Sequence, residues 1–421
     1  MPMETVETLI IGCGQAGLAM SEHLRNHGQP HLIVERKRIA ERWRTERWDS
    51  LVANGPAWHD RFASMEFAAP GPDDFASKDE IVAYFEGVAD RIEAPIRCNV
   101  NVTGVEESPD GFGFLVETSS GLIRARNVVA ATGPFQKPII PTLVPEDSGI
   151  TQIHSNSYRN PEQLPDGAVF VVGAGSSGSQ IADELLRSGR EVYLSVGPHD
   201  RPPRSYRGKD FVWWLGALGK WEAKAAPAAE HVTIAVSGAH GGRTVDFRRF
   251  AARGMTLVGR TEHYTDGTLF FAPDLADNIR QGDKNYLSVL QEADDHIARH
   301  NLGFPEEPEA HLIDPDPDCM TNPILELNLA DARVSTIIWA TGYALDFSWI
   351  KLDSFTEDGK PLHHRGVSDV PGLYFLGLPW LSMRGSSFIW GVWEDAKYLA
   401  QHIASRGSEP GIQSAHQAVG D

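Results

Sequence analysis

The sequence has few cysteines, and none of them are paired. Cys13, Cys98 and Cys319 are the three in 421 residues, and no two stand at the spacing of a dithiol redox motif or a zinc site. This excludes a disulfide framework and favours a reducing, cytoplasmic compartment. His296 and His300 stand at helical spacing, but such a pair more often faces water than binds a metal, and we expect no metal site.

The sequence also lacks an excess of positive charge and any long apolar run. The formal net charge of −19 repels phosphate backbones and anionic lipid heads, so nucleic acid and membrane surfaces are poor partners. No uncharged run reaches the ~18 residues of a membrane span, and residues 1–4 lack the basic start of a signal peptide. We therefore expect a protein that is neither exported nor membrane-bound and acts on small molecules, with a homodimer left open.

The N-terminal part of the chain has the pattern of a dinucleotide-binding unit. An apolar strand at 8–11 leads into the turn 12–17, which carries Gly12, Gly14 and Gly17, and helical spacing follows. Glycines there let backbone N–H groups approach a pyrophosphate at the positive end of a helix. Glu35 ends the next strand, where its carboxylate can accept hydrogen bonds from a ribose.

The same pattern returns near the middle of the chain. A strand at 169–172 leads into Gly173, Gly175 and Gly178, a helix and a second strand. No acidic residue ends that second strand, so a 2′-phosphate is tolerated. The cations that follow, Arg201, Arg204, Arg207 and Lys209, are suited to pair with this phosphate and favour NADPH over NADH, the alternative being a solvated basic loop.

Two buried-strand patterns, at 127–133 and 336–343, and the proline-rich stretch 134–165 indicate how the domains are divided. The sequence predicts an α/β fold with two Rossmann-like dinucleotide-binding domains. The first domain takes residues 1–145 and 335–421. The second takes 146–334, with a substrate-side insertion at about 200–332 that contains a hairpin around Gly241-Gly242 and a helix near 286–300.

Several motifs, in chain order, resemble the class B flavoprotein monooxygenases, in the flavin-containing monooxygenase-like branch with bacterial CzcO and plant YUCCA-type members. They are Glu41-Arg42-Trp43-Arg44, Arg47-Trp48-Asp49-Ser50-Leu51, Asn54-Gly55-Pro56, His154-Ser155-Asn156-Ser157-Tyr158-Arg159, Ala340-Thr341-Gly342-Tyr343, Gly372-Leu373-Tyr374-Phe375-Leu376-Gly377 and the closing helix 391–403. The chain departs from the family pattern at Ala40-Glu41, where the family has two glycines. It departs again at Ser148-Gly149-Ile150, where the family has Phe-x-Gly.

The resemblance implies a disulfide-reductase-like architecture with FAD on the first turn and NADPH on the second. It also implies that reduced flavin and O₂ form a 4a-hydroperoxyflavin, which must be kept from water. Tyr158 stands where Baeyer–Villiger enzymes tend to carry tryptophan, which favours oxygenation of nitrogen or sulfur in a small organic substrate. Three alternatives remain: a Baeyer–Villiger enzyme acting on a ketone, a flavin reductase or oxidase without oxygen insertion, and a silent nucleotide sensor.

The resemblance also assigns individual residues. Asn54 matches an asparagine that bonds the hydroperoxide, the alternative being an Asn-Gly turn residue. His154 matches an organiser of nucleotide-domain movement, the alternative being a surface histidine. The expected cofactor contacts are Gly12, Gly14, Gly17, Glu35, Arg36, Trp43, Trp48, Val102, Thr132, Gly133, Gly173, Gly175, Ser176, Ser177, Gly178, Arg201, Arg204, Thr341, Gly342 and Gly377. Five tryptophans either line a substrate cavity or fill core: Trp213, Trp214, Trp380, Trp390 and Trp393.

Overall fold

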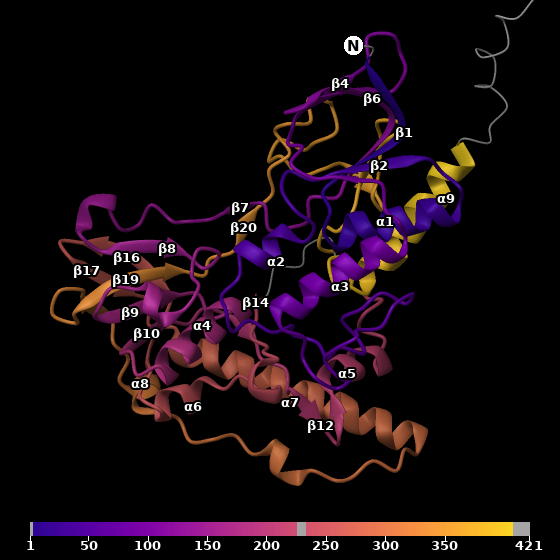
Figure 1. Ribbon diagram of the computed structural model, residues 1–421. Coiled ribbons are helices and arrows are strands. Elements are labelled where there is room, and N and C mark those ends of the chain that lie inside the picture. The colour runs from indigo at the N-terminus through magenta and orange to yellow at the C-terminus, as the bar shows by residue number, and fades with distance from the viewer. Residues whose placement is uncertain (1–2, 225–232, 407–421) are drawn as a thin grey trace, which may run out of the picture.

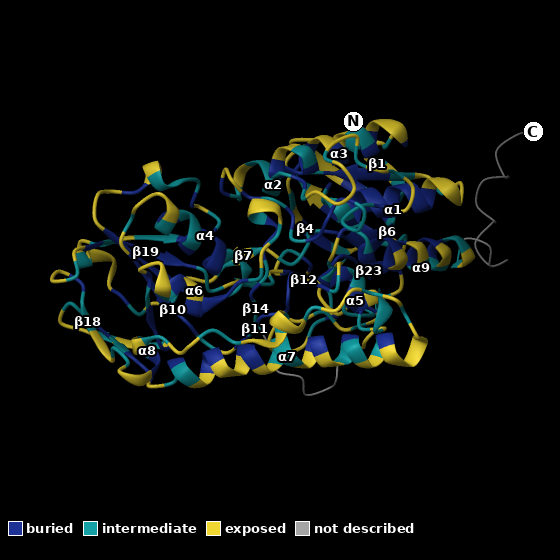
Figure 2. Ribbon diagram, turned by 90° about the horizontal axis from the view of Figure 1, so that it is seen from below, coloured by how far each residue is buried: buried dark blue, intermediate teal, exposed yellow. Residues whose placement is uncertain are grey.

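The computed structural model describes residues 3–224 and 233–406 and shows two lobes, each built on its own sheet (Figure 1). The chain enters the first lobe, crosses to the second, and returns to the first near its end. The central strands of both sheets are buried (Figure 2). The α/β fold with two dinucleotide-binding domains is thereby confirmed.

The sheet of the first lobe has the order β21-β22-β23-β6-β1-β2-β3, with β4 and β5 added antiparallel to β6. Its strands are β1 (Glu4–Ile11), β2 (His31–Val34), β3 (Ile96–Arg97), β4 (Val102–Glu107), β5 (Phe114–Thr118), β6 (Gly121–Ala130), β21 (His363–His364), β22 (Val367–Ser368) and β23 (Leu373–Phe375). β1 pairs in parallel with β2 and β6, so it is buried on both faces, and its run of Leu9, Ile10 and Ile11 is apolar throughout.

Helices cover this sheet. They are α1 (Gln15–Asn26), the short α2 (Glu41–Thr45), α3 (Lys78–Arg91) and α9 (Gly391–Arg406). α1 packs against α9, although the two are far apart in sequence (Figure 1). α3 begins at a capping box, in which Ser77 accepts from the Glu80 N–H and the Glu80 carboxylate accepts from the Ser77 N–H.

The sheet of the second lobe is parallel, in the order β15-β10-β9-β19-β8. Its strands are β8 (Thr151–His154), β9 (Ala168–Val172), β10 (Val192–Ser195), β15 (Thr256–Val258) and β19 (Val334–Trp339), and α4 (Ser176–Arg187) connects β9 to β10. Because β19 lies between β8 and β9, it belongs to this lobe. The predicted domain boundary at 334/335 is therefore wrong, and the chain leaves the second domain only after residue 339.

Two linkers connect the lobes, and they pair with each other. β7 (Lys137–Pro138) and β20 (Tyr343–Ala344) form a two-stranded antiparallel ribbon with Tyr343 opposite Pro138. The Ile139 N–H donates to the Gly342 carbonyl at 3.1 Å, which extends the contact. We call residues 137–139 and 341–344 the hinge ribbon.

The region 200–332 combines helices with short strands and connecting segments, and part of it packs against the first lobe. It holds β11 (His199–Asp200), β12 (Ser205–Tyr206), β13 (Lys209–Asp210), α5 (Phe211–Ala217), β14 (Thr233–Ile234), α6 (Phe247–Ala252), the hairpin β16 (Thr261–Thr265) and β17 (Thr268–Phe271), α7 (Leu275–His300), α8 (Asp318–Thr321) and β18 (Glu326–Asn328). The helix predicted near 286–300 is the second half of α7, which runs along one edge of the molecule with one face exposed (Figure 2). The predicted hairpin at Gly241-Gly242 is wrong, because a 3₁₀ turn spans Ala239–Gly241.

No helix within residues 3–224 and 233–406 combines the length and the apolar character that a membrane crossing requires.

Candidate functional site: two glycine-rich turns

The first glycine-rich turn leaves open space above its middle glycine. Gly12 has φ +109°, and a Cβ there would lie 2.7 Å from the Ala131 carbonyl oxygen. A Cβ on Gly17 would lie 2.0 Å from the Gly12 oxygen, so both glycines allow strand and helix to pack closely. Gly14 differs, because a Cβ there would meet nothing within 4 Å. Gly14 is also the N-cap of α1, where N–H groups point outward toward an anion.

A cavity of about 300 Å³ lies over this turn. Most of the residues predicted to contact the first cofactor line it: Gly12, Gly14, Glu35, Arg36, Trp43, Val102, Thr132, Gly133 and Gly377. Gly17 packs behind the turn. The Glu35 carboxylate accepts from the Cys13 N–H at 2.9 Å and from the Lys37 N–H at 3.1 Å, which fixes it at the cavity wall. This open, glycine-floored cavity with an acidic residue fits a dinucleotide.

Sequence reasoning missed several side chains of the cavity. Gln136 donates to the Thr132 hydroxyl at 2.9 Å. It also accepts from the Asp346 N–H at 2.6 Å, and this bond connects the N-terminal and C-terminal segments of the first domain at the cavity wall. The Arg47 guanidinium lies 5.1 Å from the Phe135 ring centre. The contacts of Gln136 with Asp346 and of Arg47 with Phe135 join residues far apart in sequence, so no local pattern indicated them. Burial, with the Glu35 carboxylate, raises the pKa of the Cys13 thiol beside the turn, so this thiol stays neutral.

The second glycine-rich turn has the same backbone but is covered. Gly173 has φ +104°, and a Cβ on Gly178 would lie 1.8 Å from the Gly173 oxygen, as in the first turn. A Cβ on Gly175 would lie 2.6 Å from the Thr233 methyl group, so the space that is open above Gly14 is filled here. Residues 233–237, which we call the covering segment, lie across the turn.

The covering segment is held by specific hydrogen bonds. The Ser176 hydroxyl donates to the Ile234 carbonyl at 2.8 Å and accepts from the Val236 N–H at 3.4 Å. β14 also pairs in parallel with β11, and the Ala235 N–H donates to the Asp200 carbonyl at 2.8 Å. Ala235 is fully buried. Ser177 lies in the first turn of α4 beside Ser176.

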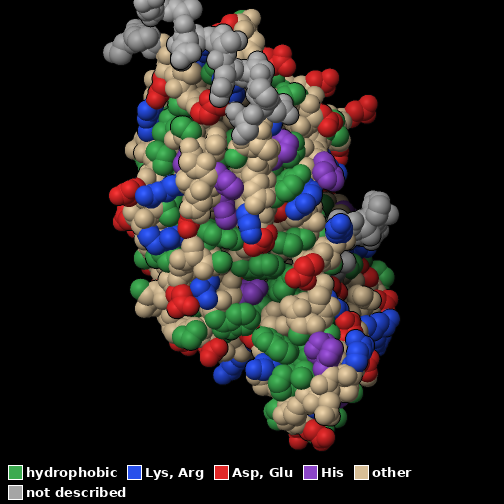
Figure 3. All heavy atoms as spheres, turned by 90° about the vertical axis from the view of Figure 1, so that its right-hand side faces the viewer, with side chains coloured by type: hydrophobic (Ala, Val, Ile, Leu, Met, Phe, Trp, Pro, Cys, Tyr) green, Lys and Arg blue, Asp and Glu red, His purple; other side chains and the backbone are tan. Residues whose placement is uncertain are grey.

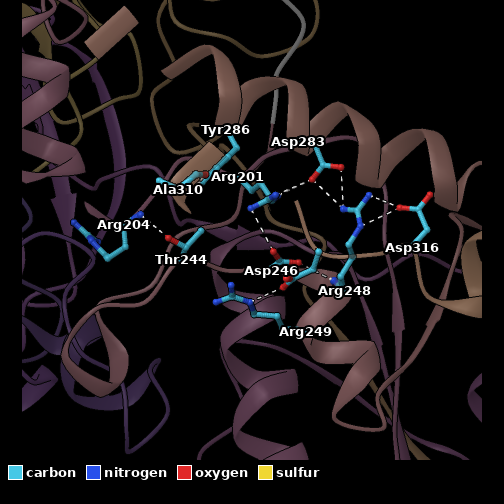
Figure 4. A network of polar contacts seen from close by, with 11 residues as sticks. Arg201, Arg204, Thr244, Asp246, Arg248, Arg249, Asp283, Tyr286, Ala310 and Asp316 are labelled. Carbon is cyan, nitrogen blue, oxygen red and sulfur yellow. Dashed lines mark hydrogen bonds and ion pairs between the residues drawn. The ribbon is translucent and has the colours of Figure 1, made fainter. Parts of the chain in front are cut away.

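The structure contradicts the expected role of Arg201 and Arg204. Both side chains are buried, and Figure 4 shows Arg201 between Asp246 and Asp283. Arg201 pairs with Asp283 at 2.7 Å and lies 4.6 Å from the Tyr286 ring centre. Arg204 pairs with Asp210 and donates to the Asn54 carbonyl. Because both guanidinium groups are buried and already bonded to carboxylates, they do not bind a 2′-phosphate. The alternative, that these two residues belong to a solvated basic loop, is also wrong.

Another cation lies where the 2′-phosphate is expected. Arg260 follows β15, and its Cγ lies 3.3 Å from the position of a Cβ on Gly197, just beyond the end of β10. Its side chain is 60% exposed and pairs with Asp274 at 2.7 Å. Arg260 is far from β10 in sequence, so the strand pattern gave no signal for it.

Asn54 lies at the contact between the two domains. Its side-chain oxygen accepts from Gln180 of α4 at 2.9 Å, and Gln180 also donates to the Val236 carbonyl at 2.8 Å. Gln180 therefore joins Asn54 to the covering segment. Asn54 is half-buried and does not line the cavity over the first turn. Its amide bonds across the domain contact, which a simple Asn-Gly turn does not require.

His154 is buried at the end of β8 and bonds to the hinge ribbon. Its two ring nitrogens lie 3.1 Å from the Asn156 side-chain oxygen and 3.0 Å from the Gly342 carbonyl oxygen. The ring also meets Tyr343 edge to face at 4.9 Å. Burial lowers the pKa of His154, so the neutral ring is favoured. The surface-loop alternative is wrong.

Three further predicted cofactor residues lie outside the cavity over the first turn. Thr341 donates to the Ile139 carbonyl and belongs to the hinge ribbon with Gly342. Trp48 is 5% exposed and packs in the core of the second domain with Leu51 and Tyr158. Thr341 and Gly342 therefore belong to the linkers between the domains, and Trp48 packs a first-domain segment against the second domain.

The comparisons with known proteins agree with this architecture. Residues 9–234 match the family model described as pyridine nucleotide-disulphide oxidoreductase. An uncharacterized CzcO-like oxidoreductase of Geobacillus kaustophilus is 34% identical over 94% of this chain and 98% of its own length. The probable indole-3-pyruvate monooxygenase YUCCA1 of Arabidopsis thaliana is 31% identical over 45% of this chain and 46% of its own length.

A solved structure, the flavin-containing monooxygenase from Stenotrophomonas maltophilia, superposes with a TM-score of 0.67 at 19% identity, covering 96% of this chain and 100% of the other. At this identity the likeness shows the fold. Together with the family match, it gives an oxidoreductase and flavoprotein whose cofactors are FAD and NADPH, and the glycine-floored cavity fits the first of them. The chain belongs to the class B flavoprotein monooxygenase family within the pyridine nucleotide-disulphide oxidoreductases.

Proposed function

We propose that this protein is an NADPH- and O₂-dependent flavin monooxygenase that oxygenates a nucleophilic nitrogen or sulfur in a small organic molecule. The observation that carries the proposal is the position of Asn54. Its amide lies between the flavin domain and α4, the helix that begins at the second glycine-rich turn. An amide at this place is suited to bond reactive oxygen beside a flavin.

The residues of the first turn and its cavity would hold FAD. The N–H groups at the start of α1 would meet the pyrophosphate above Gly14, and Glu35 would accept from the ribose. When bound, FAD takes up the hydride of NADPH and activates O₂. The Gly17 and Gly12 backbones keep the floor of the site rigid through their close packing.

NADPH would bind at the second turn after the covering segment has moved. The Ser176 hydroxyl and the N–H groups of α4 now face Ile234 and Val236, and they are the donors that a pyrophosphate needs. Arg260 would take the 2′-phosphate, because it is the exposed cation beside the end of β10. Displacement of Val236 also removes one partner of Gln180, so nucleotide binding changes the group that holds Asn54.

His154 would position the domains without acting as a base. Its bonds to Asn156 and the Gly342 carbonyl connect the end of β8 to the hinge ribbon, through which the nucleotide domain moves. The lowered pKa keeps the ring neutral, so Nε2 donates to the Gly342 carbonyl and Nδ1 accepts from the Asn156 N–H at 3.2 Å.

A product assay tests the proposal. The FAD-loaded protein is given NADPH and air with a sulfide and a cyclic ketone side by side, and sulfoxide, lactone and hydrogen peroxide are counted per NADPH. We expect sulfoxide as the main product. Lactone as the main product would assign the Baeyer–Villiger reaction instead. Hydrogen peroxide alone would assign an oxidase, and FAD binding without NADPH turnover would assign a nucleotide sensor.

A further inference from the structure

An aromatic cluster is formed by three segments that are far apart in sequence, the first of which follows Asn54 closely along the chain. Its members are Trp58, His59, Trp221, Phe388 and Trp390. The His59 ring stacks on Trp221 at 5.2 Å and lies 5.3 Å from Trp390 and 5.5 Å from Trp58. Phe388 packs against Trp221 at 5.4 Å. Of the tryptophans expected to line a cavity or fill core, Trp390 belongs to this cluster, whereas Trp393 lies in the core of the flavin domain.

The cluster contains a fixed histidine. His59 Nδ1 lies 2.7 Å from the Asp60 carboxylate, and the other Asp60 oxygen accepts from the Gly55 N–H at 3.0 Å. A Cβ at position 55 would lie 2.4 Å from Asp60, so glycine is required after Asn54 for this contact. A carboxylate on Nδ1 favours the proton on that nitrogen and leaves Nε2 as an acceptor.

Two polar atoms of the cluster are buried and have no hydrogen-bond partner in the described part of the chain. They are His59 Nε2, on a side chain only 9% exposed, and Trp390 Nε1. Buried polar atoms are nearly always bonded in folded proteins, and exceptions mark places where a ligand or water belongs. Here an acceptor and a donor remain unbonded within one group of aromatic rings.

The loop that carries two members of the cluster is attached to the wall of the cavity over the first turn. The loop 379–390, which carries Phe388 and Trp390, follows Gly377 of the cavity wall. Gln15, also at that wall, donates to the Ser387 carbonyl at 3.3 Å. Phe388 is 41% exposed, so its side chain is free to turn away from Trp221. Hydrophobic side chains gather across the middle of one face of the molecule (Figure 3).

We propose that the aromatic cluster is the substrate site of the monooxygenase and that it takes a planar aromatic amine whose N–H donates to His59 Nε2. The inference rests on the proposed function for the reaction but not for the binding. The rings of Trp221 and Trp390 pack against the substrate ring, and Asp60 orients His59. An N–H bonded to His59 leaves the lone pair of the amine nitrogen free to react.

Equilibrium binding without NADPH tests the site apart from turnover. N-methylaniline, N,N-dimethylaniline and N-methylcyclohexylamine are titrated into FAD-loaded protein, and tryptophan fluorescence is followed. N-methylaniline should bind about tenfold more tightly than N,N-dimethylaniline, as expected for one hydrogen bond. The cyclohexyl compound should bind more weakly than N-methylaniline, because it lacks the aromatic face and because it is a cation at neutral pH, which burial disfavours.

His59→Phe keeps an aromatic ring and should abolish the difference between the two anilines, and Asp60→Asn should reduce it. His263→Phe is the control, since His263 stacks on Phe270 at 4.4 Å in the hairpin of the other domain. Equal affinities in the unaltered protein, or a difference that survives in His59→Phe with FAD retained, would overturn the inference. Sulfoxide formation with no aniline binding would leave the proposed function standing while the inference fails. Selective binding with peroxide as the only product would do the reverse.

Discussion

The two glycine-rich turns of this protein share one backbone and differ in what lies above it. In both, the first glycine has a positive φ and the third packs against the first, with Cβ distances of 2.0 Å at Gly17 and 1.8 Å at Gly178. The middle glycine faces open space in the first turn and the Thr233 methyl group in the second. The local pattern therefore determines the shape of a dinucleotide turn, and a distant segment determines whether it is accessible.

The largest effect is expected from closing the open turn. In Gly14→Val the side chain occupies the space that the pyrophosphate needs, so the protein should lose nearly all its FAD. The ratio of flavin absorbance to protein after gel filtration measures this. Gly303→Val is the control, because position 303 is likewise free of neighbours within 4 Å but lies far from the turn in sequence. Stoichiometric FAD in Gly14→Val would remove the first turn from the site.

The next effect concerns the amide that connects the two turns. Asn54→Ala should still consume NADPH, while oxygenated product falls by roughly 10²-fold and hydrogen peroxide rises, as expected for the loss of one preorganised donor. Peroxide and product are counted per NADPH in one sample, with the exposed Asn322→Ala as control. Unchanged coupling in a folded, FAD-loaded Asn54→Ala would show that Asn54 has no catalytic role.

A smaller effect is expected from the cation beside the covered turn. Arg260→Ala should lower the preference for NADPH over NADH by about tenfold, the low end for a charged hydrogen bond, because the side chain is 60% exposed. The ratio of kcat/KM for the two nucleotides measures this, with Arg299→Ala at the end of α7 as control. If the ratio does not change, the 2′-phosphate is bound elsewhere.

The smallest effect is expected from loosening the cover itself. Thr233→Ala removes the methyl group above Gly175 and weakens the closed state, so NADPH should bind about threefold to tenfold more tightly. FAD content should not change. Thr265→Ala, an exposed position in the β16–β17 hairpin, is the control. Weaker NADPH binding in Thr233→Ala would mean that Thr233 supports the nucleotide rather than excludes it.

The sequence predicts best what depends on neighbours along the chain. Both βαβ units, the turn glycines and Glu35 at the cavity wall follow from strand and helix periodicity over about thirty residues. The interpretation of Arg201 fails because its carboxylate partner, Asp283, lies on α7, which only the fold brings near. Arg204 differs, because its partner Asp210 follows it closely in the sequence. β19 was assigned to the wrong domain because a buried strand pattern does not specify its sheet.

Hydrogen exchange in the covering segment tests the central claim, which is that the second turn is closed until a nucleotide opens it. The amides of Ala235 and Val236 are bonded to the Asp200 carbonyl and the Ser176 hydroxyl. Exchange is measured on the FAD-loaded protein with and without saturating NADP⁺. We predict that both amides exchange faster when NADP⁺ is bound, because the segment leaves the turn and they lose these partners. Unchanged or slower exchange would contradict the account, because the nucleotide would then bind with the covering segment in place.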